Sequence, residues 1–267
     1  ADHYHRYKED IKLMAEMGFK TYRFSIAWTR LIPNGTGEIN QAGIDHYNDV
    51  INTCLEYNIE PLVTMFHFDM PDALDKRGSW SNPESVDWFV NFAKVMFENF
   101  GDRVKYWLTI NEQNMLTLVG PLIGTLRIPE GTTNVLKEVY QQNHHMLVAQ
   151  AKAMVLCHEM LPNAKIGPAP NISYVYPASC KPEDILAAQE FNAIRNWLYL
   201  DMAVYGKYNN LVWTYLEEND ATPTFAEGDE EAVWRILDER LELCKEALLC
   251  RHEALLGTTS DISPIHW

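Results

Sequence analysis

The sequence lacks the features that would place the chain in a membrane or on nucleic acid. None of its apolar runs approaches the roughly 20 residues that a transmembrane helix needs. Its 22 Lys and Arg residues are outnumbered by 37 Asp and Glu residues, which gives a formal net charge of −15. Phosphate backbones are bound by clustered cations. We therefore expect neither a membrane nor a nucleic-acid partner.

Cysteine is scarce, and no two cysteines have the C-x2-C spacing of a zinc site. The five thiols are scattered along the chain at Cys54, Cys157, Cys180, Cys244 and Cys250. An odd number of scattered cysteines is typical of reduced thiols, so the sequence predicts a cytoplasmic protein. His3 and His5 lie two residues apart, but no third clustered ligand with suitable spacing follows, and we expect no metal site.

Helical and strand-like patterns alternate along the first part of the chain. Amphipathic patterns predict helices over about 10–17, 41–56 and 135–160, and another behind an N-cap at Asn82. Short apolar runs predict strands at 21–26, 61–65, 104–110 and 165–169. Strands that alternate with helices in this way form a parallel sheet covered by helices.

Two parallel architectures fit this alternation. An open doubly wound sheet would carry a Gly-rich phosphate turn after an early strand, and the sequence has none. A barrel places polar side chains just beyond the carboxyl end of each strand. Such residues follow every expected strand: Ser25, His67 with Asp69, Asn111 with Glu112, and Asn171. The sequence therefore predicts a barrel of the (β/α) type.

Four ordered motifs carry a resemblance to a known family. They are His3-Tyr4-His5-Arg6-Tyr7-Lys8-Glu9-Asp10, Tyr22-Arg23-Phe24-Ser25-Ile26-Ala27-Trp28, His67-Phe68-Asp69-Met70-Pro71 and Trp107-Leu108-Thr109-Ile110-Asn111-Glu112-Gln113. Over about residues 1–229, the chain resembles the family-one β-glucosidases and 6-phospho-β-glucosidases. The resemblance implies a partial (β/α)8 TIM barrel with about four of the eight strands. It also implies a β-glucoside or phospho-β-glucoside as substrate, and no cofactor.

The resemblance implies roles for five residues. Glu112 matches the acid that protonates the departing glycosidic oxygen, which retaining enzymes pair with a carboxylate nucleophile about 5 Å away. Arg23 matches the guanidinium that orients that nucleophile. His67, Asn111 and Asn171 match side chains that bind the sugar. Considered without their motifs, His67 would be interpreted as a hydrogen-bonded core histidine and Arg23 as the partner of a buried carboxylate.

The motif of the family's nucleophile, Thr-Glu-Asn-Gly, does not occur in the sequence. Asp69 is the nearest second carboxylate by motif, but nothing gives it the nucleophile's role. We therefore expect little or no hydrolysis from the chain alone. The alternatives are a sugar-binding remnant without chemistry and a chimeric or truncated reading frame. A half barrel would leave sheet edges and apolar faces uncovered, which predicts self-association.

The sequence after residue 229 departs from the family. One apolar stripe predicts a helix to about Leu256, and its members are Val233, Ile236, Leu237, Leu241, Cys244 and Leu248. Residues 231–267 resemble an internal segment of anaerobic ribonucleoside-triphosphate reductases, mainly at Arg240-Leu241-Glu242-Leu243-Cys244 and Ser263-Pro264-Ile265-His266-Trp267. We predict a glycosidase part at 1–229 and a divergent or foreign helical tail at 230–267.

Overall fold

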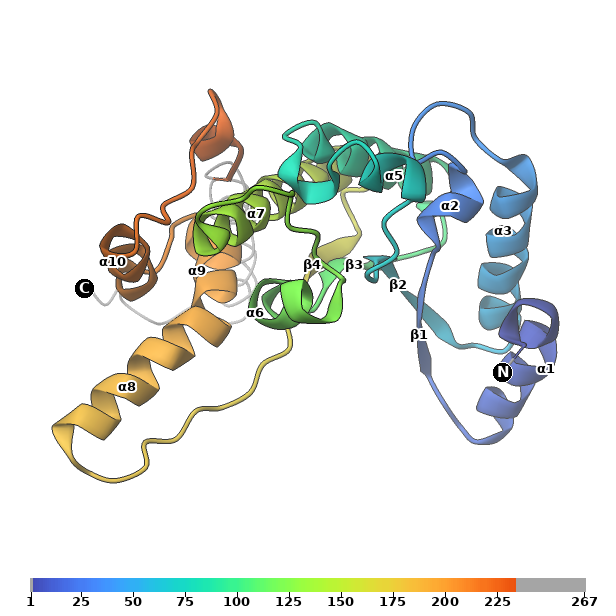
Figure 1. Ribbon diagram of the computed structural model, residues 1–267. Helices are drawn as coiled ribbons and strands as arrows, with labels where there is room; N and C mark the ends of the chain where they lie inside the picture. Colours follow the sequence, from blue (N-terminus) through green and yellow to red (C-terminus); the bar gives the residue numbers. More distant parts are fainter. Residues whose placement is uncertain (1, 234–267) are drawn as a thin grey trace, which may run out of the picture.

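The fold is a sheet of four parallel strands in the order β1-β2-β3-β4, seen in a computed structural model that describes residues 2–233 (Figure 1). The strands are β1 (Thr21–Ser25), β2 (Glu60–Phe66), β3 (Tyr106–Asn111) and β4 (Lys165–Ala169). All four were predicted within two residues of these bounds. The predicted tail helix falls outside the described residues apart from its first apolar position, Val233.

Helices cover one face of this sheet. They include α3 (Gln41–Glu56), α5 (Ser85–Phe100) and α7 (Val135–Met160), and the bounds of α3 and α7 are those predicted. The main core lies between these helices and the strands, where Val63, Met65 and Trp107 are at most 1% exposed. Leu62 and Leu108 alternate with these residues and are only half-buried, so the opposite face of the sheet is less covered at these two positions.

Two helix starts differ from the sequence prediction. Helix α1 spans His3–Glu16 and begins well before residue 10. The prediction missed its first turns because Ile11 is its only buried residue, so those turns carry little apolar signal. Asn82 does not cap α5, whose N-cap is Glu84. The Asn82 side chain instead accepts a hydrogen bond of 2.9 Å from the Glu84 N–H and closes the turn between the 3-10 helix η1 (Ser79–Ser81) and α5.

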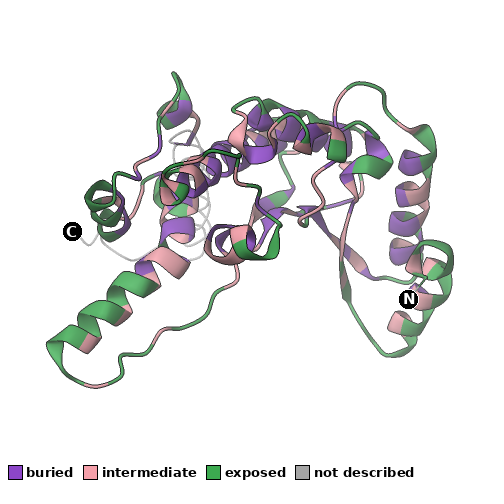
Figure 2. Cartoon of the chain, viewed as in Figure 1, coloured by how far each residue is buried: buried purple, intermediate pink, exposed green. Residues whose placement is uncertain are grey.

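The remaining elements were not predicted individually. They are α2 (Trp28–Leu31), α4 (Asp72–Asp75), α6 (Gln113–Ile123), α8 (Pro182–Asn192), the π-helix η2 (Ala193–Trp197), α9 (Leu198–Tyr205) and α10 (Asn210–Glu218). Helix α8 extends away from the sheet and contains no buried residue (Figure 2). None of the helices between residues 2 and 233 combines the length and apolar character that a bilayer span requires.

The two outer strands each have a single neighbour. Within residues 2–233, β1 pairs only with β2, and β4 pairs only with β3. Such edges present unpaired N–H and C=O groups to any chain that can add a strand. Self-association through these edges remains a prediction.

Acidification is expected to destabilise the fold through His144, a buried residue of α7. Its ring contacts the Tyr208 hydroxyl and the Asp229 carboxylate, each at 3.1 Å. Burial lowers the pKa of His144, and the hydrogen bond to the Asp229 carboxylate opposes this only in part. An unfolded histidine has a pKa of about 6.5, so below that pH the unfolded chain binds a proton that the folded chain does not. The free energy of unfolding is therefore expected to fall as the pH drops below about 6.5.

Urea titrations at several pH values measure this effect. We expect His144→Gln to lose part of the pH dependence below about 6.5, whereas His5→Gln, at an exposed histidine, retains it. Equal pH profiles for the wild type and the His144 variant would contradict the prediction.

Candidate active site

A row of hydrogen-bonded side chains crosses three strands at the carboxyl end of the sheet. Arg23 of β1 donates to Thr64 Oγ1 at 3.0 Å and to Asn111 Oδ1 at 2.5 Å. The Asn111 amide nitrogen lies 3.1 Å from His67 Nε2, and His67 Nδ1 lies 3.1 Å from Ser25 Oγ. The structure thus places three of the five predicted site residues in direct contact: Arg23, His67 and Asn111.

The register of the parallel strands explains this convergence. Ser25 lies opposite Thr64, and Phe66 lies opposite Ile110. Because the strands run in the same direction, the residues that follow them gather at one edge. Arg23 and Asn111 are 88 residues apart in the sequence, and the pairing of the strands brings them together.

Glu112 follows β3 directly and adopts a left-handed backbone conformation, with φ 45° and ψ 46°. A residue with a side chain costs about 1–3 kcal/mol in such a conformation and needs support from its surroundings. The support comes from β4, since the Glu112 N–H donates to the Ala169 carbonyl at 2.8 Å, and from α6, which starts at the next residue. The Glu112 side chain is half-buried.

A buried polar network lies behind Glu112. Gln113 donates to the Asn143 side chain at 2.8 Å, and Thr117 donates to the same oxygen at 3.1 Å. Gln150 of α7 bonds both Gln113 and Thr109, which joins β3, α6 and α7. If one of these hydrogen bonds broke, its donor would remain buried without a partner, which is costly. The network therefore fixes the start of α6 against α7. These residues were not predicted, although polar positions among the apolar ones of α7 were a visible signal.

Asn171, the remaining predicted sugar ligand, has other partners. Its side-chain oxygen accepts a hydrogen bond of 2.9 Å from Arg195 in η2. Asn114, which is fully buried, bonds the Asn171 backbone at both its N–H and its carbonyl. No hydrogen bond joins Asn171 to the row among the described residues. Arg195 had no motif around it in the sequence and was not predicted.

Asp69 is held by backbone groups. Its two carboxylate oxygens accept from the N–H groups of His67 and Trp28, each at 3.2 Å. A carboxylate that bridges two chain segments in this way acts as a brace between the end of β2 and the start of α2. These two hydrogen bonds give Asp69 a structural role, so its presence in the motif does not require a role in covalent chemistry.

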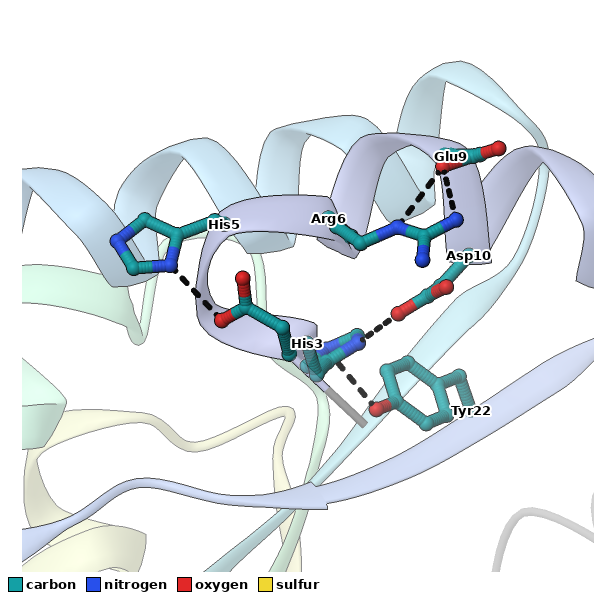
Figure 3. A network of polar contacts seen from close by, with 7 residues as sticks. His3, His5, Arg6, Glu9, Asp10 and Tyr22 are labelled. Carbon is teal, nitrogen blue, oxygen red and sulfur yellow. Dashed lines mark hydrogen bonds and ion pairs between the residues drawn. The ribbon is translucent and has the colours of Figure 1, made fainter.

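The first motif forms a separate network on α1 (Figure 3). His3 contacts Asp10 at 2.7 Å and the Tyr22 hydroxyl at 3.2 Å, and thereby joins α1 to β1. His5 contacts Asp2 instead. Within residues 2–233, no group of three or more His, Cys, Asp or Glu side chains is arranged to hold a metal ion.

Comparisons with known proteins give the same assignment over most of the chain. Residues 1–241 match the family described as Glycosyl hydrolase family 1. The 1,4-beta-D-glucan glucohydrolase of Thermotoga neapolitana is 41% identical over 241 residues, which make up 89% of this chain and 55% of that protein. The 6-phospho-beta-glucosidase AscB of Escherichia coli is 44% identical over 240 residues, or 89% of this chain and 50% of that protein.

A solved structure extends the comparison to the fold. The beta-glucosidase from Thermotoga maritima in complex with glucoimidazole matches with a TM-score of 0.78 and 40% identity, over 88% of this chain and 52% of that chain. The four parallel strands therefore match about half of the TIM barrel of these enzymes, as predicted. The chain spans about half the length of the curated relatives it matches.

Proposed function

The chain belongs to glycosyl hydrolase family 1, and we propose that it supplies the acid/base half of a retaining β-glycosidase, with Glu112 as the proton donor. The observation that carries this proposal is the position of Glu112 next to Asn111, at the same sheet edge as the row formed with Arg23 and His67. A proton donor and several sugar-binding groups at one edge are the components that glycosidic bond cleavage needs.

In the proposed reaction, a nucleophilic carboxylate attacks the anomeric carbon while Glu112 donates its proton to the departing oxygen. The deprotonated Glu112 then removes a proton from the water that releases the sugar from the covalent intermediate. The Asn111 amide has two N–H groups, so it can donate one to His67 and the other to a sugar hydroxyl. Arg23 is proposed to orient the nucleophile with guanidinium hydrogens that its bonds to Thr64 and Asn111 do not use.

The substrate is proposed to be a β-glucoside or a 6-phospho-β-glucoside. The relatives include proteins named for either class, such as the glucohydrolase of Thermotoga neapolitana and AscB of Escherichia coli. Asn171 is proposed as a further sugar ligand. Its bond to Arg195 leaves its amide N–H groups available for a hydroxyl.

The nucleophile is proposed to come from strands that these residues do not include. The 267 residues contain no Thr-Glu-Asn-Gly motif, and both oxygens of Asp69 are engaged by backbone N–H groups. Without a nucleophile the first step has no acceptor for the sugar. We therefore expect the chain alone to show little or no turnover.

This expectation is tested with p-nitrophenyl β-glucoside and its 6-phosphate. We expect no hydrolysis above background by the 267-residue chain, and hydrolysis of one of the two substrates when a polypeptide with the other half of a family relative is added. The same mixture prepared with Asn111→Ala should be less active. Turnover by the chain alone near that of a full-length relative would contradict the proposed division of the site.

A second candidate is a sugar-binding remnant without chemistry. The observation in its favour is that Arg23, Asn111 and His67 form their row without any nucleophile. Calorimetry with glucose distinguishes the two, because a remnant that works alone must bind sugar measurably in the isolated chain.

The proposed foreign origin of residues 230–267 is tested by sequencing the source reading frame beyond both ends. The family match continues through residue 241.

A further inference from the structure

We propose that Ser25 is a positioning residue that holds His67 as the neutral tautomer protonated on Nδ1. His67 Nε2 is then an acceptor, and its lone pair takes an N–H of Asn111. The tautomer follows from the contacts of these side chains and does not rest on the proposed function.

Arg23 sets the direction of the hydrogen bonds in the row, because a guanidinium can only donate. Its guanidinium contacts one atom of the Asn111 side chain, so that atom must be the carbonyl oxygen. The amide nitrogen of Asn111 therefore faces His67 Nε2, at 3.1 Å. An amide N–H also only donates, which makes Nε2 the acceptor and leaves it without a proton.

A neutral imidazole without a proton on Nε2 carries it on Nδ1. Nδ1 lies 3.1 Å from Ser25 Oγ, and a hydroxyl oxygen can accept that hydrogen bond. The His67 backbone N–H is bound to Asp69 at 3.2 Å, which holds the main chain at the base of the ring. The ring therefore has a defined partner on each nitrogen.

Both ends of the row come from one strand. Ser25 stands two residues after Arg23 on β1, so the two side chains lie on the same face of the strand. Arg23 sets the direction of the hydrogen bonds at one end, and Ser25 accepts the last one at the other. The Ser25 hydroxyl stabilises this tautomer because its oxygen accepts the proton of Nδ1.

The tautomer also decides what Asn111 can offer to a ligand. One amide N–H is bound by the Nε2 lone pair, and the carbonyl oxygen is bound by Arg23. This leaves the second N–H of Asn111 to donate to a ligand group.

Nitrogen-15 NMR of the histidine rings tests the proposal on the complete chain, at about pH 8, where an ordinary histidine is neutral. His67→Gln identifies the His67 signals. We expect the pattern of an imidazole protonated on Nδ1. Ser25→Ala is expected to lower the ratio of the Nδ1-protonated to the Nε2-protonated form by roughly fivefold to tenfold, the ratio that one hydrogen bond controls.

Ser25→Thr keeps the hydroxyl and should restore the wild-type pattern. Ser173→Ala, at an exposed serine beyond β4, should leave it unchanged. A wild-type ring protonated on Nε2, or a Ser25→Ala ring identical to wild type, would overturn the proposal. The wild-type spectrum decides the tautomer even where a variant fails to fold. Because no substrate is needed, a failure here leaves the glycosidase proposal standing, and a lack of hydrolysis leaves the tautomer intact.

Discussion

Glu112→Gln lowers kcat by about 10²- to 10⁴-fold for a substrate with a poor leaving group, once the remaining strands are supplied. Glutamine has the shape of glutamate but no acidic proton to give to the departing oxygen. The substitution leaves the backbone bond from residue 112 to the Ala169 carbonyl in place, so the site keeps its geometry. Alkyl glucosides are the sensitive substrates, because an alkoxide leaves slowly without a proton.

The leaving group provides an internal control for this prediction. A nitrophenolate leaves without much help from an acid, so its release should depend less on Glu112. Glu60→Gln is a matched control in the protein, since Glu60 begins β2 at the opposite end of the sheet and pairs with Lys105 at 3.1 Å. Equal losses for alkyl and nitrophenyl substrates would argue against Glu112 as the proton donor.

Gly43→Ala is expected to reduce the free energy of unfolding by about 3 kcal/mol. Gly43 lies in the first turn of α3, where an alanine would ordinarily stabilise a helix by about 1 kcal/mol. Here a Cβ atom would lie 1.9 Å from the Arg30 carbonyl oxygen and 2.7 Å from its carbon. These are backbone atoms of α2, and they cannot rotate away as a side chain can.

Thermal unfolding measures this effect. For a chain of this length, a loss of about 3 kcal/mol corresponds to a decrease of roughly 6–12 °C in Tm. Gly167→Ala in β4 is the control, because an added Cβ would meet no atom within 4 Å there. A Gly43 variant as stable as wild type would show that α2 and α3 approach less closely than the structure indicates.

The alternation of strands and helices was predictable because each element has its own spacing of apolar residues over a short stretch of sequence. The apolar runs at 61–65 and 165–169 and the helical pattern at 135–160 each predicted an element that the structure contains. Weakly patterned elements were harder to recognise. Helix α1 was predicted only in its second half because it buries one residue, and α8, which buries none, gave no usable apolar pattern.

The sequence by itself determined which residue types stand at the ends of the strands, and hence the family and the half barrel. Only the tertiary structure decided which side chains contact each other. Arg23 bonds Asn111, which is 88 residues away in the sequence, and Arg195 bonds Asn171. Both carboxylate oxygens of Asp69 accept from backbone N–H groups. The physical reason is that strand identity follows from the pattern of neighbouring residues, whereas a hydrogen bond between distant side chains depends on strand register. Register is fixed only when the sheet is assembled and its helices are packed.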